Sequence, residues 1–147
     1  MWKIALAPIL AMLALVACGS DPAVPTLLVT DVCGFDGPTT LRGGTARLTL
    51  QRTGLGDYGA VVARLEDGHD VADLEEHFST VSEIWDERPE WLVINYSVQV
   101  DDTDVDSPTG DTELIRLNPG SYAVVCINYS DDRAGVASAV EVIADSP

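Results

Sequence analysis

The sequence predicts a mainly β fold, a single Greek-key β-sandwich with one short helix. About seven short segments are rich in β-branched and other apolar residues and are separated by turn residues, whereas only one segment has helical spacing. No segment repeats another. The chain has 147 residues, and the 130 that follow the first 17 are enough for one domain with a hydrophobic core but not for two. A two-sheet sandwich is the architecture that such a pattern favours.

The strand pattern is clearest where Ala46, Leu48 and Leu50 alternate with polar residues, because that period of two buries one face and exposes the other. Glycine, proline and aspartate residues between the segments supply the turns, as in Asn118-Pro119-Gly120. The predicted strands are residues 26–33, 45–52, 58–65, 91–100, 113–117, 121–129 and 136–144.

One helix is predicted between the third and fourth strands. Its apolar residues recur at steps of three and four, Asp70 is placed to cap its N-terminus, and acids fill its early turns. The apolar stripe, which we expect to pack on the sandwich, consists of Val71, Leu74, Phe78, Val81 and Trp85.

The amino-terminal segment has the features of an export signal. Lys3 precedes an apolar stretch that is shorter than the ~20 residues a transmembrane helix needs. The stretch closes with Leu15-Val16-Ala17-Cys18, which closely resembles the lipobox of bacterial lipoprotein precursors. That resemblance implies a signal peptide over residues 1–17 and lipid on Cys18; the alternative is an ordinary secretory signal with an incidental cysteine.

A short tether separates the lipidated cysteine from the domain. Residues 18–26 include two prolines, a serine and a glycine without apolar periodicity, so they are expected to be extended. The β-sandwich domain then covers residues 27–147. This organisation predicts a protein held at the cell membrane through its lipid anchor, on the extracytoplasmic face.

The charge of the chain is strongly acidic. Lys3 is the only lysine, so the part after residue 17 has seven arginines against 24 acids, a formal charge of −17. Nucleic acid is excluded as a partner because its phosphates would repel this charge, and an anionic lipid surface would repel it too. An acidic surface that keeps an exported domain soluble is one interpretation, and cationic or divalent-metal partners are the other.

Two cysteines remain once Cys18 carries lipid. Cys33 and Cys126 form an even pair in an oxidising compartment, so we predict a disulfide that closes a 93-residue loop. Two free thiols, or a cysteine that binds metal, are the alternatives.

Three stretches resemble the cupredoxin-like domains, over roughly residues 27–144. Residues 35–45 are similar to the stretch that leads through a glycine turn into the second strand, and residues 48–68 to the strand, turn and strand before a copper-ligand histidine. Residues 117–126 resemble the PG-x-Y-x-x-x-C run that ends at the copper-ligand cysteine. The resemblance implies a cupredoxin-like sandwich, and an immunoglobulin-like sandwich would explain the same strands.

The copper ligands that this family implies are missing. A type 1 site needs two imidazoles and a thiolate, usually with a weak thioether. Leu55, Gly56, Asp57 and Tyr58 occupy the turn that would offer the first histidine, and neither histidine nor methionine follows Cys126. We therefore expect no cofactor and no inherited electron transfer.

An acidic stretch between two strands is the densest candidate for a metal site. Counted from Asp102, acids occupy positions one, three, five and twelve, the spacing of a calcium loop, although the central glycine of such loops is absent. A calcium or other divalent-cation site would use Asp102, Asp104, Asp106 and Glu113; a solvated acidic loop is the alternative reading.

Catalysis has little support in the sequence. His69 lies beside Asp67 and Asp70, and His77 beside Glu75 and Glu76, but neighbours in sequence do not converge on one substrate atom. No nucleophile elbow, phosphate-binding glycine loop or CxxC pair is present. The prediction is a monomeric, non-enzymatic binding or accessory module with an unknown protein or glycan partner. Trp85 and Trp91 either anchor that partner or cap the core.

Overall fold

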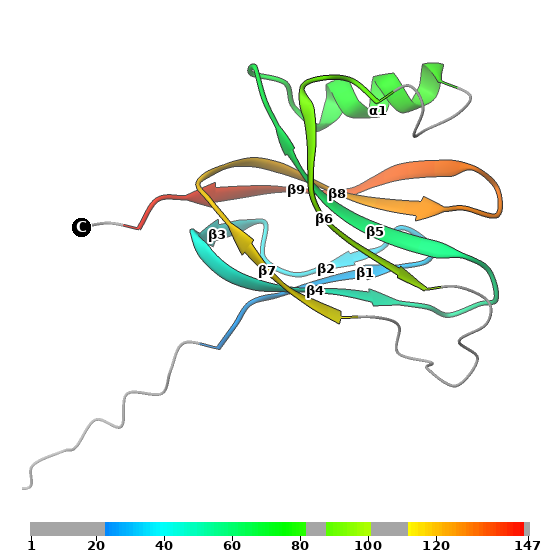
Figure 1. Cartoon of the computed structure of the whole chain (residues 1–147), viewed down its shortest axis with the longest axis horizontal. Coiled ribbons are helices and arrows are strands. Elements are labelled where there is room, and N and C mark those ends of the chain that lie inside the picture. Colours follow the sequence, from blue (N-terminus) through cyan, green and yellow to red (C-terminus); the bar gives the residue numbers. More distant parts are fainter. Residues whose placement is uncertain (1–22, 82–87, 101–111, 146–147) are drawn as a thin grey trace, which may run out of the picture.

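The computed structural model describes residues 23–81, 88–100 and 112–145, and these form two packed β-sheets and one helix. Figure 1 shows three layers: a lower sheet, a central sheet and a helix, α1, above the central sheet. The start of the first strand and the end of the last one lie at the same end of the sandwich. The two-sheet sandwich predicted from the sequence is confirmed. No helix in these ranges is long and apolar enough to span a bilayer.

The lower sheet has the strand order β2-β1-β4-β7. Alternation in β4 places Ala46, Leu48 and Leu50 toward the other sheet and Thr45 and Arg47 toward solvent, as its period of two predicts. β1 runs parallel to β4, and β7 runs antiparallel to it. The strands of this sheet are β1 (Thr26–Thr30), β2 (Phe35–Asp36), β4 (Gly44–Gln51) and β7 (Thr112–Leu117).

The central sheet has the order β3-β9-β8-β5-β6. Its middle strands are apolar almost without interruption, as expected for strands that are buried on both faces. β8 returns beside β5 after the chain has passed through β6 and β7, which is a Greek-key path. The strands are β3 (Thr40–Arg42), β5 (Tyr58–Leu65), β6 (Leu92–Val100), β8 (Gly120–Asn128) and β9 (Arg133–Ile143).

The two faces of the central sheet bury different hydrophobic clusters. Between the sheets lies the intersheet core, whose largest fully buried members are Leu27, Leu48, Leu50, Ile115, Val29, Val62, Val124, Val140 and Val142. On the opposite face lies the helix-side core, built around Leu74 of α1 and consisting of Val61, Ala63, Leu65, Leu74, Leu92, Ala123, Val125 and Ile127.

Two β-bulges let strands β6 and β9 contribute to both cores. Tyr96 pairs with Val62 and Ile94 with Ala63, so the register shifts at Asn95. Tyr96 consequently packs on the intersheet core and Ile94 on the helix-side core, although they are two residues apart and would share a face in a regular strand. β9 has the same kind of shift between residues 136 and 138.

The helix α1 spans Val71–Thr80 and begins with the predicted cap. The Asp70 carboxylate accepts hydrogen bonds from the amides of Ala72 (2.8 Å) and Asp73 (3.1 Å), and the Asp73 carboxylate accepts one from the Asp70 amide at 3.0 Å. This reciprocal capping box satisfies three amide donors that would otherwise lack partners inside the helix. Leu74 is fully buried against the central sheet and Val71 and Phe78 pack beside it, so the predicted packing is confirmed for these three residues of the stripe.

The boundaries differ from the predictions in a few places. β1 ends at Thr30 because the chain turns there, with the Cys33 amide donating to the Thr30 carbonyl at 2.9 Å. The short strands β2 and β3 lie where the sequence predicts loop. The helix ends at Thr80, so Val81 of the predicted stripe is its C-cap, and Trp85 lies outside the described residues.

Candidate functional site

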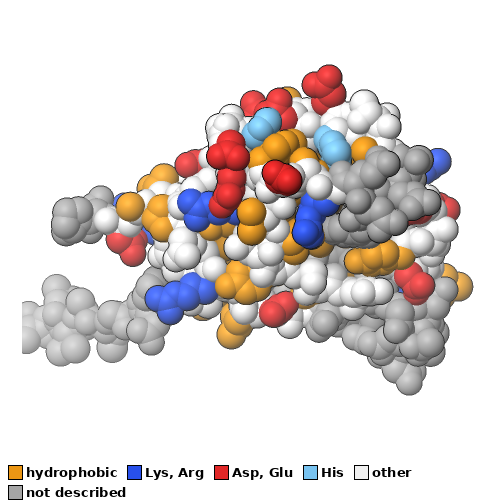
Figure 2. Space-filling view, turned by 45° about the horizontal axis from the view of Figure 1, so that its top comes forward, with side chains coloured by type: hydrophobic (Ala, Val, Ile, Leu, Met, Phe, Trp, Pro, Cys, Tyr) orange, Lys and Arg blue, Asp and Glu red, His pale blue; other side chains and the backbone are white. Residues whose placement is uncertain are grey.

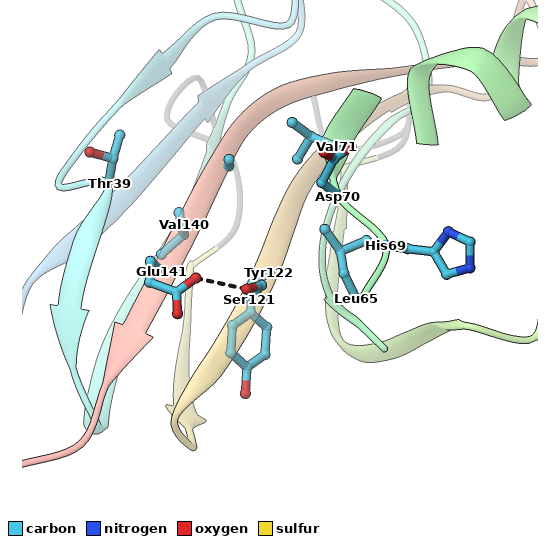
Figure 3. Close-up of a pocket in the computed structure, with 10 residues that line it drawn as sticks. Thr39, Leu65, His69, Asp70, Val71, Ser121, Tyr122, Val140 and Glu141 are labelled. Carbon is cyan, nitrogen blue, oxygen red and sulfur yellow. Dashed lines mark hydrogen bonds between the residues drawn. The ribbon is translucent and has the colours of Figure 1, made fainter. Parts of the chain in front are cut away.

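A groove beside the start of α1, with polar side chains from several strands on its walls, is the candidate site (Figure 3). It has a volume of about 290 Å³. Its walls come from four separate parts of the chain: the approach to β3, the β5–α1 turn, the start of β8 and the end of β9. The lining residues are Thr39, Leu65, His69, Asp70, Val71, Ser121, Tyr122, Ala139, Val140 and Glu141.

Ser121 and Glu141 form the polar wall of this groove. They are directly opposite each other on β8 and β9, and the Ser121 hydroxyl donates to Glu141 Oε2 at 2.7 Å. The Glu141 amide donates to the Thr39 carbonyl at 2.8 Å, which fixes the strand that carries the carboxylate. With the Asp70 carboxylate on the other wall, the groove offers oxygen acceptors to a cationic or hydroxylated ligand.

His69 is held away from that polar wall. Its Nδ1 lies 3.1 Å from Asp73 Oδ2, and its ring stacks on Trp91 with 4.2 Å between the ring centroids. In Figure 3 the imidazole points away from Ser121 and Glu141. The imidazole is therefore not positioned to accept a proton from the Ser121 hydroxyl in this arrangement.

The acid next to His69 is stabilised in its charged form. The hydrogen bond from the Asp70 amide, and then the contact with His69, hold the pKa of the Asp73 carboxyl below its usual value. The contacts of Asp73 and His69 therefore stabilise the N-terminus of α1. Figure 2 shows the histidines among acidic side chains on the helix-bearing side of the molecule.

The opposite end of the sandwich holds the disulfide. Cys33 and Cys126 are joined, with 5.3 Å between their Cα atoms, as the cysteine count predicts. Gly135 lies against the bond, since a Cβ at that position would be 3.2 Å from Cys33 Sγ and 3.4 Å from Cys126 Sγ. A depression of about 370 Å³ opens beside the disulfide and is lined by Asp31, Val32, Cys33, Cys126, Ile127, Asn128, Arg133, Ala134 and Gly135.

Asp31 ties the turn that carries Cys33 to the end of β4. Its carboxylate accepts from the Thr53 amide (2.8 Å), the Thr53 hydroxyl (2.7 Å) and the Gly54 amide (2.9 Å). Partial burial opposes ionisation of this carboxyl, but the hydrogen bonds outweigh burial, so the pKa of Asp31 lies below its usual value. This network is a structural clamp on two loops.

The residues proposed for metal binding are not brought together in the described part of the chain. Asp102, Asp104 and Asp106 lie outside the described residues, and Glu113 is exposed on β7. No group of three or more histidine, cysteine or acidic side chains that could hold a metal ion is found in residues 23–81, 88–100 and 112–145. The calcium hypothesis therefore stays a prediction.

Two other sequence candidates have positions in the structure. His77 lies on α1, and Trp91 is half-buried against the helix-side core. Of the two roles proposed for the tryptophans, Trp91 has the packing role, and its indole also supports the His69 ring. Sequence reasoning missed Thr39, Ser121 and Glu141, because nothing in their local sequence shows that three distant segments meet at one groove.

Comparisons with known proteins add little to this site. No protein-family model matches the sequence, and no curated protein matches it. Among solved structures, the chain is similar to the sodium-dithionite-reduced auracyanin of the photosynthetic bacterium Roseiflexus castenholzii. The two share 18% identity with a TM-score of 0.41, over 80% of this chain and 94% of that chain.

Proposed function

We propose that this protein is a membrane-anchored, extracytoplasmic lipoprotein whose β-sandwich is a non-enzymatic binding or accessory module. The disulfide between Cys33 and Cys126 is the observation that carries the proposal. A disulfide that closes a 93-residue loop persists in an oxidising compartment, which agrees with export.

The same bond bears on redox function. The resemblance described above would make Cys126 the thiolate ligand of a copper site, but both cysteine sulfurs are used in the disulfide. The two histidines lie in the turn before α1 and on α1, beyond the outer face of the central sheet. These positions support a sandwich that does not transfer electrons through a type 1 copper ion.

Membrane attachment rests on the sequence from Leu15 to Cys18 and on the charged start and apolar stretch before it. Two or more acyl chains on one cysteine give stable anchoring, where a single chain would be marginal. The tether then carries the sandwich a short distance from the bilayer.

Ligand binding is assigned to the groove lined by Asp70, Ser121 and Glu141. Its volume fits a small ligand or one side chain of a partner, and its acceptor-rich wall favours a cationic or hydroxylated group over an anion. The groove lies at the end of the sandwich where β1 begins, since the Ser121 end of β8 and the start of β1 lie at the same end.

The anchor is tested with the full chain expressed in a bacterium that processes lipoproteins. Wild type is expected to partition into detergent and to carry acyl chains on Cys18 by mass spectrometry, whereas Cys18→Ala is expected to stay unprocessed. Acyl-free wild type would disprove the anchor.

The module itself is tested by metal analysis and a free-thiol count on the same purified protein. No copper and no free thiol are the expected results. Stoichiometric copper together with a free thiol at Cys126 would disprove the non-redox assignment, and stoichiometric calcium would favour the acidic stretch as a site.

A further inference from the structure

The outer face of the lower sheet differs in charge from the rest of the molecule. The chain has 24 acids, but among the strand residues of this face Asp36, on the edge strand β2, is the only acid. Arg47 and Arg116 are exposed there, and neither guanidinium forms an ion pair with another residue in the described ranges. The net charge of the chain therefore does not describe this face.

The strand register places these arginines around an exposed leucine. Arg47 on β4 is directly opposite Leu114 on β7, and Thr45 is opposite Arg116, so both arginines flank Leu114 on one face. The inward-pointing neighbours Ile115 and Leu117 are buried, whereas Leu114 is 61% exposed. A leucine between two cations presents the combination of groups that an interface both anionic and apolar would contact.

The same patch adjoins the point where the tether enters the domain. Thr26 pairs with Arg47, and the Arg47 amide donates to the Pro25 carbonyl at 2.8 Å. Val24, just before this contact, is 40% exposed. Pro25 is seven residue steps after Cys18, and at no more than ~3.6 Å per step they span at most about 25 Å.

We infer that Val24, Arg47, Leu114 and Arg116, the sheet patch, dock the domain on the anionic lipid surface that holds its own anchor. This inference rests on the lipoprotein assignment above. Arginine pairs with lipid phosphate groups through its planar fork of donors, and Leu114 and Val24 enter the interface between the headgroups. The anchor keeps the patch near the bilayer, so weak contacts suffice to orient the domain. The groove at the tether end and the helix on the far side then take fixed positions relative to the membrane.

Charge repulsion from the remaining acids does not prevent this orientation. Surface charges further than a Debye length, about 8 Å at physiological ionic strength, are largely screened from the bilayer. The layer that carries α1 lies on the opposite side of the central sheet from the patch (Figure 1). Among the strand residues of this face the two arginines outnumber the single acid, Asp36, and the acids of the α1 layer lie beyond the central sheet.

The test uses the full lipidated protein in vesicles of phosphatidylcholine alone, or of phosphatidylcholine with phosphatidylglycerol. A fluorophore is attached through a noncanonical residue at position 45, which is opposite Arg116 of the patch, or at position 75, on the exposed side of α1. Lipids that carry a nitroxide at the headgroup quench it on contact. We expect quenching at position 45 in the anionic vesicles, much less in the neutral ones, and none at position 75.

The charge dependence is tested with Arg47→Gln combined with Arg116→Gln. Each basic residue near an anionic surface contributes about 1 kcal/mol, so the double variant is expected to lower the ratio of docked to undocked domain by roughly 30-fold. Arg88→Gln with Arg133→Gln removes the same charge elsewhere and is expected to leave quenching unchanged. High salt is expected to weaken quenching at position 45.

The outcomes separate this inference from the proposed function. Protein that floats with the vesicles through Cys18 but shows no anionic-lipid-dependent quenching at position 45 overturns the docking and leaves the anchor intact. Equal quenching in the two double variants overturns the role of the arginines. Protein that does not float with vesicles overturns the lipoprotein assignment and the docking together.

Discussion

The two faces of the central sheet are buried in different ways. On one face the intersheet core is closed by the four strands of the lower sheet and by the disulfide. On the other face the helix-side core is closed by the ten residues of α1, and Phe78 and Trp91 at its border are only partly buried.

This difference shows how a single domain of this size divides its stability between two hydrophobic cores. The intersheet core joins segments that are far apart in sequence, so its loss would unfold the sandwich. The helix-side core depends on one short helix, which would be marginal in isolation and is held by its cap and by Leu74. We expect the helix layer to open locally at a lower free energy than the sheets do.

Removal of the disulfide is expected to have the largest effect. Cys33→Ala with Cys126→Ala frees a 93-residue loop in the unfolded chain, and the chain-entropy relation gives a loss of about 4 to 5 kcal/mol in the free energy of unfolding. Urea unfolding of the double variant and the wild type measures it. A loss below about 1 kcal/mol would show that the sheets alone hold the intersheet core.

Truncation of one leucine in each core compares the cores directly. Leu48 and Leu74 are both fully buried. Leu48→Ala is expected to cost about 3 to 5 kcal/mol because the two sheets cannot collapse onto the cavity, and Leu74→Ala about 2 to 3 kcal/mol because the helix can move.

Leu48→Ala and Leu74→Ala are also expected to expose different parts of the molecule. Hydrogen exchange is expected to show Leu74→Ala exposing mainly the amides of α1, with those of β8 still protected, whereas Leu48→Ala lowers protection throughout. If Leu74→Ala destabilised β8 as much as α1, the two cores would be one cooperative unit.

Much of this fold follows from the sequence because its signals are local. The alternation in β4, the unbroken apolar run of β8 and the capping aspartate at Asp70 each appear within a few consecutive residues. The disulfide followed from the cysteine count and the predicted compartment. The bulge at Asn95 did not, because it depends on which core each half of β6 reaches.

The candidate groove was beyond sequence reasoning for a physical reason. Ser121 and Glu141 meet only through the β8–β9 register, and Thr39 joins them only because β3 runs parallel to β9. The sequence instead drew attention to His69, whose acidic neighbours are conspicuous. In the structure that histidine contacts the Asp73 carboxylate and stacks on the Trp91 ring.

Loss of the Asp31 hydrogen bonds, near the disulfide, is expected to lower the free energy of unfolding less than the core truncations do. Asp31→Asn replaces an anionic acceptor of three hydrogen bonds by an amide whose nitrogen cannot accept, and we expect a loss of about 2 kcal/mol at neutral pH. Because the folded pKa is lowered, the clamp's charge contributes stability above the unfolded pKa. That contribution is lost as the pH falls through the folded value. Denaturation at several pH values is expected to show wild type and variant converging in acid; a gap that persists there would assign the cost to packing.

The helix cap is expected to show the smallest effect. Asp70→Ala removes the acceptor for the amides of Ala72 and Asp73 but keeps the backbone amide that binds Asp73, so half of the capping box remains. The expected loss in the free energy of unfolding is about 1 kcal/mol.

Hydrogen exchange is the most sensitive measurement of this loss. If the helix layer opens on its own, the amides of α1 exchange faster in the variant, while the exchange rates of the β5 and β8 amides stay unchanged. Asp70→Asn, which can still accept from those amides, serves as the matched control and is expected to recover most of the loss. If Asp70→Ala lowered the protection of β8 to the same extent as that of α1, the helix layer would not be separable from the sandwich.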